Sequence, residues 1–120
     1  MADRVLTISW GAVVRGAEER SLEVFNEALG LMGQMQQDGR IESFHVVLTT
    51  ADSDLGGYIE VQGTANQIAA IREDEAFLRN TIDASLVVDD LRHSTGYTNE
   101  GIATIMGIYQ EAISKVPQRT

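Results

Sequence analysis

Alternating apolar and polar residues, the pattern of a β-strand with one buried face, limit the fold of this chain more than any other feature. The pattern occurs at residues 4–10, 41–50 and 57–63, and we expect a fourth strand at residues 82–90. Only the turn-rich sequence ADSDLGG separates the second strand from the third. Such a short connection predicts an antiparallel hairpin.

Helical periodicity fills the longer gaps between these strands. Apolar residues recur at spacings of three and four from about residue 17 to residue 38, which predicts an amphipathic helix. Gly39 is suited to cap that helix in a left-handed conformation. Gly30 and Gly33 lie inside the helix, where glycine is unfavourable, and they could mark a close approach by another element.

The second half of the chain predicts more helices. Thr64 and Gln67 have the spacing of a capping box, Asp74 could cap a short helical segment, and residues 98–116 predict the last helix. The order is therefore strand, helix, strand, strand, helix, strand, helix. With right-handed crossovers it gives a four-stranded antiparallel βαββαβ sheet with helices on one face and an extra C-terminal helix. We expect one α+β domain over residues 1–120.

In this order of elements the whole chain resembles the ferredoxin-like fold, and with its added helix it is most similar to the dimeric α/β-barrel superfamily. That superfamily includes cofactor-free monooxygenases, muconolactone isomerase and polyketide cyclases. The resemblance implies a homodimer in which two sheets close into a barrel. It also implies a hydrophobic organic ligand that is handled without a bound cofactor. It rests on element order, and no short motif transfers a catalytic residue to this sequence.

Parity along the strands separates a face that meets the helices from a polar back face. We expect Val46 to pair with Val61 and His45 with Gln62, since this register turns the large aliphatic residues of both strands toward the helices. The residues expected on the back face are Thr7, Ser9, His45, Val47, Tyr58, Glu60, Gln62, Val87 and Asp89. Water can cover such a face, or a second copy of the chain can; we favour the second copy, and hence a homodimer.

Composition excludes several classes of function. The chain has no cysteine, which rules out disulfides, thiolate zinc sites and cysteine nucleophiles. Its formal net charge of -9 argues against nucleic acid and anionic membranes as partners. The N-terminus lacks the pattern of a signal peptide and no apolar run is long enough for a membrane span. We therefore expect a cytoplasmic protein.

His45 and His93 could in principle hold iron together with a carboxylate. We expect them near opposite edges of the sheet, which lie roughly 14 Å apart at about 4.8 Å per pair of neighbouring strands. A metal–nitrogen bond is only about 2 Å long. We therefore predict no metal and no other cofactor within one subunit, while a site that bridges two subunits stays open.

Two candidate sites remain. On the back face, His45 with Tyr58 or Glu60 could transfer a proton, although a cross-strand contact would explain the same residues. Between sheet and helices, an apolar pocket could bind a flat organic molecule, although core packing would explain its residues too. The candidates for its lining and rim are Trp10, Arg15, Phe25, Met32, Met35, Phe44, Phe77, His93, Tyr97 and Met106.

These residues leave two functions open. One is a small enzyme or ligand-binding protein for a hydrophobic organic molecule, without a tightly bound cofactor. The other is a non-catalytic ligand-binding, regulatory or assembly module of the same fold. A cavity of several hundred Å³ with convergent polar groups would favour the first, and a dense core with a sealed polar dimer face would favour the second.

Overall fold

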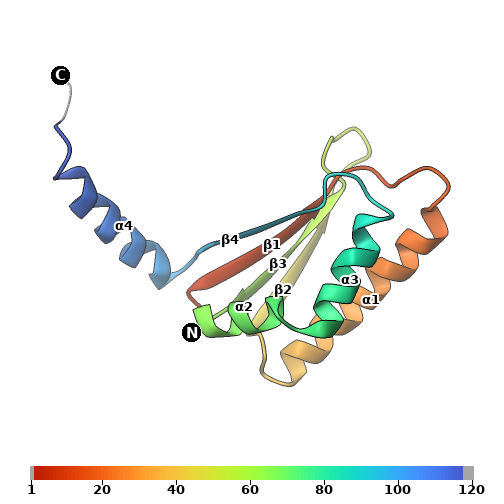
Figure 1. The fold of residues 1–120 in the computed structure, drawn as a ribbon, viewed down its shortest axis with the longest axis horizontal. Coiled ribbons are helices and arrows are strands. Elements are labelled where there is room, and N and C mark those ends of the chain that lie inside the picture. Colours follow the sequence, from red (N-terminus) through yellow and green to blue (C-terminus); the bar gives the residue numbers. More distant parts are fainter. Residues whose placement is uncertain (1, 118–120) are drawn as a thin grey trace.

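A computed structural model describes residues 2–117 and contains a four-stranded antiparallel sheet with three helices on one face (Figure 1). The strands are β1 (Arg4–Trp10), β2 (Ser43–Leu48), β3 (Gly57–Gly63) and β4 (Arg92–Tyr97). The helices are α1 (Glu18–Gln37), α2 (Ala65–Arg72), α3 (Glu75–Ser85) and α4 (Glu100–Ile113). The strand order is β2-β3-β1-β4, so the predicted ferredoxin-like arrangement is confirmed.

The core lies between the central strands and the helices. Leu6 on β1 is opposite Val61 on β3, and both side chains are completely buried. They pack in one apolar cluster with Met32 and Met35 of α1 and Ile71 of α2. The alternating pattern of β1 and β3 is thus explained by one face that excludes water.

The β2–β3 hairpin is shifted by two residues from the predicted register. Val46 pairs with Ile59 instead of Val61, and His45 pairs with Glu60 instead of Gln62. Because a shift of two residues keeps each side chain on its side of the sheet, the predicted division into two faces is confirmed for β1, β2 and β3. In this register Gly57 lies between Leu48 of β2 and Trp10 of β1, where it leaves room for the indole ring.

The prediction of a strand at residues 82–90 is wrong. Asp74 does cap a helix, because its side chain accepts a hydrogen bond from the Phe77 N–H. That helix, α3, continues to Ser85 and takes up the first part of the expected strand. After it, Val88 makes only an isolated bridge to Val13.

The true fourth strand, β4, lies between the expected strand at residues 82–90 and the last helix, where the sequence predicts no regular element. β4 contains no aliphatic side chain, so hydrophobic alternation does not reveal it. It can do without one because it is an edge strand in which four of the six residues are exposed. Val87 and Asp89 are consequently absent from the back face: Val87 is buried beneath the β1–α1 connection, and the Asp89 backbone bonds Gly11.

Two helix signals are confirmed and one is wrong. Gly39 has the expected left-handed conformation, with φ of 77°. Thr64 and Gln67 form both hydrogen bonds of the capping box. Gly30 and Gly33 do not mark a close approach, because a Cβ atom at either position would meet no atom within 4 Å.

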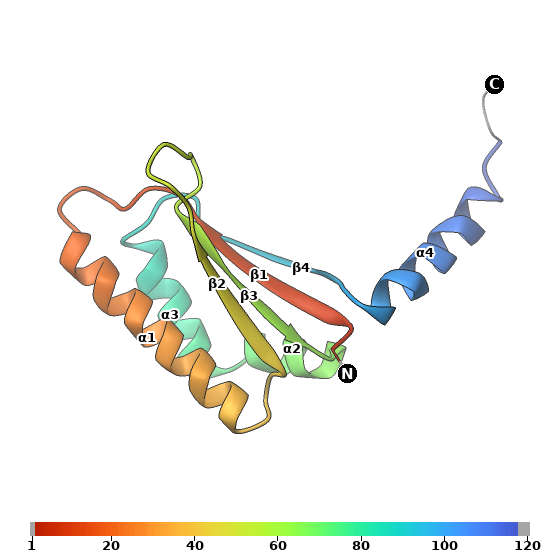
Figure 2. The same ribbon diagram turned by 180° about the vertical axis from the view of Figure 1, so that it is seen from behind.

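The last helix, α4, extends away from the rest of the molecule beyond β4 (Figures 1 and 2). β4 is its main neighbour. Among the residues described, no helix combines the length and the apolar character that crossing a membrane requires.

Candidate ligand-binding cavity

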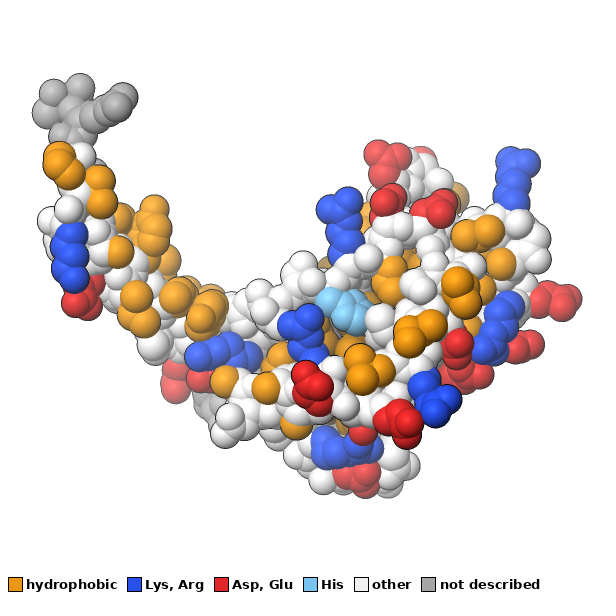
Figure 3. All heavy atoms as spheres, viewed as in Figure 1, with side chains coloured by type: hydrophobic (Ala, Val, Ile, Leu, Met, Phe, Trp, Pro, Cys, Tyr) orange, Lys and Arg blue, Asp and Glu red, His pale blue; other side chains and the backbone are white. Residues whose placement is uncertain are grey.

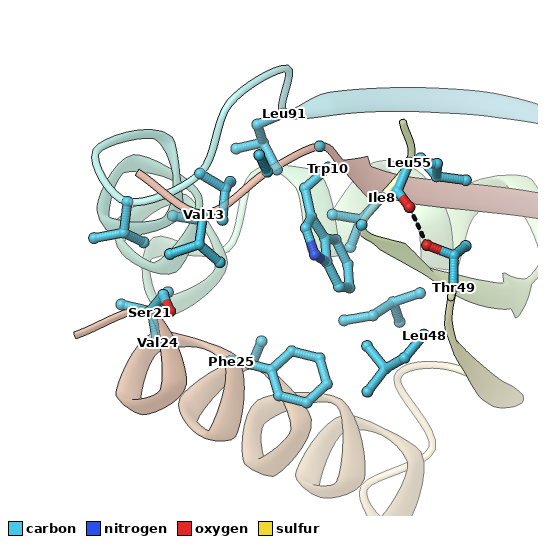
Figure 4. A pocket seen from close by; sticks show the side chains of 18 of the residues that line it. Ile8, Trp10, Val13, Ser21, Val24, Phe25, Leu48, Thr49, Leu55 and Leu91 are labelled. Carbon is cyan, nitrogen blue, oxygen red and sulfur yellow. Dashed lines mark hydrogen bonds between the residues drawn. The ribbon is translucent and has the colours of Figure 1, made fainter. Parts of the chain in front are cut away.

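A cavity of about 770 Å³ lies between the sheet and helices α1 and α3 (Figure 4). Ile8 and Trp10 of β1 line it on the sheet side, Phe25 lines it from α1, and Ala84 lines it from α3. The loop of residues 49–56, which joins β2 to β3, forms part of the rim. Small residues where the helices face the strands, such as Ala84, leave this end of the core unfilled.

Trp10 and Phe25 form an aromatic wall. Their ring centroids are 5.8 Å apart and the ring planes meet at 63°, an edge-to-face contact. Figure 4 shows the indole of Trp10 projecting from β1 into the space above Phe25. This wall offers a flat ligand the aromatic surface that is common in binding sites for organic molecules.

Two glycines hold the indole in place. A Cβ atom on Gly56 would lie 2.2 Å from the Gly11 carbonyl oxygen and 2.9 Å from Cδ1 of Trp10. A Cβ atom on Gly57 would lie 2.7 Å from the Val47 carbonyl oxygen and 2.9 Å from Cζ2 of Trp10. Only glycine lets the hairpin pass this close to the ring. The paired glycines of the sequence therefore shape the cavity as well as the turn.

Few polar groups face the cavity. The Asn80 side chain donates to the Val24 carbonyl oxygen at 3.1 Å, which leaves its own carbonyl oxygen as an acceptor. Within residues 2–117, neither that oxygen nor the indole N–H of Trp10 has a hydrogen-bond partner. Asp54, at the rim, is the one titratable side chain in the lining. The lining also includes the hydroxyl groups of Ser21, Thr49, Thr50 and Ser53, which are engaged in hydrogen bonds within the chain. The walls are thus mostly apolar, and the indole N–H and the Asn80 oxygen remain as a donor and an acceptor for a ligand.

The structure distributes the predicted pocket residues over several places. Trp10 and Phe25 line the cavity. Met32, Met35 and Phe77 are buried in the closed part of the core, and Phe44 packs against it. The remaining residues lie outside the cavity lining: Arg15 is exposed in the β1–α1 connection, Met106 is exposed on α4, and Tyr97 lies at the end of β4 beneath the Arg4 guanidinium.

His93 lies on the helix side of β4, away from the cavity. Its ring is 5.4 Å from the ring of Phe77. Burial lowers the pKa of His93, and the positive charge of Arg72 lowers it further. Both effects favour the neutral imidazole near pH 7.

His45 is exposed on the back face, opposite Glu60 on β3. Tyr58 lies two pairs further along on the same face, opposite Val47. The structure therefore brings the three predicted back-face residues into one neighbourhood. His45 and His93 lie on opposite faces of opposite edge strands, so within one subunit they cannot ligate the same ion.

Sequence reasoning missed much of the cavity. The sequence predicts rim residues 51–56 only as a turn. It predicts Thr49 and Thr50, and likewise Val87 and Val88, which also line the cavity, as parts of strands. The one signal that could have located the rim is the glycine pair after ADSDL, since two adjacent glycines before a strand often permit a close approach.

No protein-family model matches this sequence, and no curated protein does. Solved structures do resemble it in fold. A dimeric protein of unknown function with a ferredoxin-like fold from Bacteroides fragilis matches with a TM-score of 0.60, at 9% identity, over 79% of this chain and 96% of that one. A dimeric ferredoxin-like protein of unknown function from Jannaschia sp. matches with a TM-score of 0.59, at 10% identity, over 80% and 98%. SnoaB, a cofactor-independent oxygenase from Streptomyces nogalater, matches with a TM-score of 0.54, at 14% identity, over 82% and 95%.

At these identities the similarity is one of architecture. The chain has the ferredoxin-like fold of these proteins, which confirms the fold that its resemblance to the dimeric α/β-barrel superfamily implied.

Proposed function

We propose that this protein binds a flat, hydrophobic organic molecule in the cavity between its sheet and helices, as a homodimer and without a tightly bound cofactor. The observation that carries the proposal is the cavity with its aromatic wall. Its volume of about 770 Å³ falls within the range of roughly 300–1,000 Å³ that small-molecule sites occupy. Protein interiors are normally close-packed, so an ordinary core would leave no space of this volume.

The polar groups narrow the class of ligand. A carbonyl or ether oxygen could accept the indole N–H of Trp10, and a hydroxyl could donate to the Asn80 carbonyl oxygen. Asp54 at the rim disfavours an anion. A neutral aromatic molecule with a hydroxyl and a carbonyl group fits this lining best. The fold similarity to SnoaB, a cofactor-independent oxygenase, supports a function without a bound cofactor by analogy of fold.

Trp10 allows a direct test, because it is the only tryptophan of the chain and it lines the cavity. Umbelliferone and acridone are flat, neutral probes that absorb where tryptophan emits. Titrating either probe at mildly acidic pH, where umbelliferone keeps its hydroxyl proton, is expected to quench Trp10 emission in a saturable way. The fluorescence of the bound probe should rise in parallel through energy transfer.

A cavity-filling variant separates binding in the cavity from binding elsewhere. Ala84→Phe places a ring in the cavity and is expected to weaken both probes at least tenfold. Ala69→Phe makes the same change on the exposed surface of α2, outside the lining, and should bind like the parent. Absence of saturable quenching with both probes would contradict the proposal, as would unchanged affinity in Ala84→Phe.

For the homodimer, the back face of the sheet is the proposed interface. No helix covers it in the described chain (Figure 2). Val5, Val47 and Tyr58 add apolar surface to its polar residues, and these side chains are only half-buried. Two proteins of the same fold are dimeric, which supports the proposal. A second sheet would cover this mixed face and close the barrel.

A charged side chain introduced at the centre of this interface tests the proposal. Thr7 lies on the back face opposite Glu60, which could pair with a new cation in a monomer. Thr7→Arg is therefore expected to keep the fold, by circular dichroism, but to become monomeric by light scattering. Thr95→Arg, on the exposed helix side of β4, should remain dimeric. A dimeric Thr7→Arg protein would contradict the back-face interface.

A further inference from the structure

Specific contacts at the start of helix α4 hold the helix away from the rest of its own chain. The Thr98 N–H donates to the Asp3 carbonyl oxygen at 3.1 Å. The Asn99 side chain donates to the Ala2 carbonyl oxygen at 2.8 Å, and Asn99 itself has a left-handed φ of 51°. Gly101 is buried against Asp3, where a Cβ atom would lie 2.2 Å from the carbonyl oxygen. The direction of α4 is therefore built into the residues that precede and begin it.

The projecting helix carries an apolar stripe. Ile102, Met106 and Tyr109 follow one another at spacings of four and three, so their side chains share one side of the helix. These three and Ile108 are between 47% and 60% exposed. Figure 3 shows hydrophobic side chains gathered along α4, apart from the body of the molecule. A row of large exposed apolar residues on one helix indicates an interaction surface.

Nothing in α4 itself accounts for a stable isolated helix. It has 14 residues, which is marginal in water even for good helix formers. Gly107 and several β-branched residues lower its propensity further. The N-cap residue before the helix, Asn99, makes no side-chain capping bond to it. The helix thus needs a surface on which its stripe can pack.

We infer that this surface belongs to a second copy of the chain, and that two copies exchange their α4 helices. The inference rests on the homodimer proposed above. α4 leaves from the end of β4, at the rim of the back face, so a copy that covers that face lies next to the helix. A two-fold dimer then buries both helices by the same contact. A membrane fits α4 poorly, since its polar side carries Glu100 and Glu111 whereas surface-bound helices are rich in Lys and Arg.

The inference is tested with charges on the stripe of the full chain. Met106→Glu combined with Tyr109→Glu is expected to raise the dimer dissociation constant about 100-fold or more, because each α4 helix would bury two unpaired charges. The matched control is Thr104→Glu combined with Ser114→Glu, which adds the same charge at exposed positions on the polar side of the helix and should leave the constant within a few-fold of the parent. Sedimentation over a dilution series measures both constants.

A second measurement identifies the contact itself. Dimers mixed from isotope-labelled and unlabelled parent chains should show nuclear Overhauser effects between the Ile102 or Met106 methyl groups of one copy and protons of the other. Parent-like dimerisation of the Met106→Glu/Tyr109→Glu variant would overturn the exchange, and so would the absence of these signals in the mixed dimer. Binding of the parent chain to lipid vesicles in place of self-association would overturn it as well.

Thr7→Arg, measured beside the Met106→Glu/Tyr109→Glu variant of α4 (the arm variant), separates this inference from the back-face proposal. If Thr7→Arg stays dimeric while the arm variant dissociates, the exchange stands and the back-face interface fails. If Thr7→Arg dissociates while the arm variant stays tightly dimeric, the back face stands and the exchange fails. A parent chain that is monomeric at all concentrations would contradict both proposals. None of these three results bears on ligand binding in the cavity, which Trp10 quenching tests.

Discussion

Replacing Leu6 with alanine is expected to lower the free energy of unfolding by about 3–4 kcal/mol, which is typical of removing a fully buried leucine side chain. Leu6 is completely buried on the central strand β1, opposite Val61 on one side and Thr95 on the other. The two neighbouring backbones are tied to β1 by hydrogen bonds and cannot collapse into the space. Urea titration followed by circular dichroism measures the loss. It is made at one protein concentration because the stability of the proposed dimer would depend on concentration.

The matched control for Leu6→Ala is Leu86→Ala. Leu86 follows α3 and is 71% exposed, so the same chemical change should alter the free energy of unfolding by no more than about 0.5 kcal/mol. Similar losses in the two variants would contradict the division between core and surface. Because losing 3–4 kcal/mol is large against the roughly 5–15 kcal/mol that stabilise an ordinary domain, Leu6→Ala should also unfold well below the temperature of the parent.

Replacing Gly57 with alanine is expected to cost about 1–3 kcal/mol through overpacking and to weaken ligand binding in the cavity. The new Cβ atom would lie 2.7 Å from the Val47 carbonyl oxygen and 2.9 Å from Cζ2 of Trp10. The carbonyl belongs to the β2–β3 hairpin and cannot move freely, so the indole must shift. We expect a changed Trp10 emission maximum and a lower affinity for umbelliferone, together with the loss of stability in urea titration.

The same substitution at Gly30 should have the opposite sign. Gly30 lies inside α1, and a Cβ atom there would meet no atom within 4 Å. Gly30→Ala is therefore expected to raise the free energy of unfolding by about 0.5–1 kcal/mol, since alanine is the better helix former. Its Trp10 emission and umbelliferone affinity should match the parent. If Gly57→Ala behaved like Gly30→Ala in both assays, the close fit of the hairpin against Trp10 would be wrong.

The sequence does not separate the apolar residues that line the cavity from those that fill the core. Trp10 and Phe25 were expected in a pocket between sheet and helices, and both line the cavity. Phe77, Met32 and Met35 have the same apolar character and the same helical spacing, yet they pack in the closed core. Apolar side chains that fill a core and those that line a cavity obey the same periodicity. What separates them is how far the helices stand from the sheet at each position, which depends on the whole packing.

The position of the fourth strand is a second feature that the local sequence pattern does not predict. Residues 82–90 contain aliphatic residues suited to a strand, but the cap at Asp74 starts a helix that continues through the first of them. β4 contains Arg92, Ser94 and Gly96 among its six residues and has no apolar alternation. It is a strand because β1 offers it an unpaired edge, with Leu6 opposite Thr95 and Ile8 opposite His93. Pairing between distant segments overrides local preference in such a strand.

By itself the sequence determined the elements whose apolar period is complete: β1, β2, β3, α1, and the caps at Thr64 and Asp74. It also determined which way their side chains face, because parity along a strand survives a shift of two residues. Only the tertiary structure decided the hairpin register, the position of β4, the room beside Trp10 and the direction of α4. Each of these depends on contacts between residues far apart in the chain, such as Gly57 against Trp10 and Gly101 against Asp3, and no local pattern records such contacts.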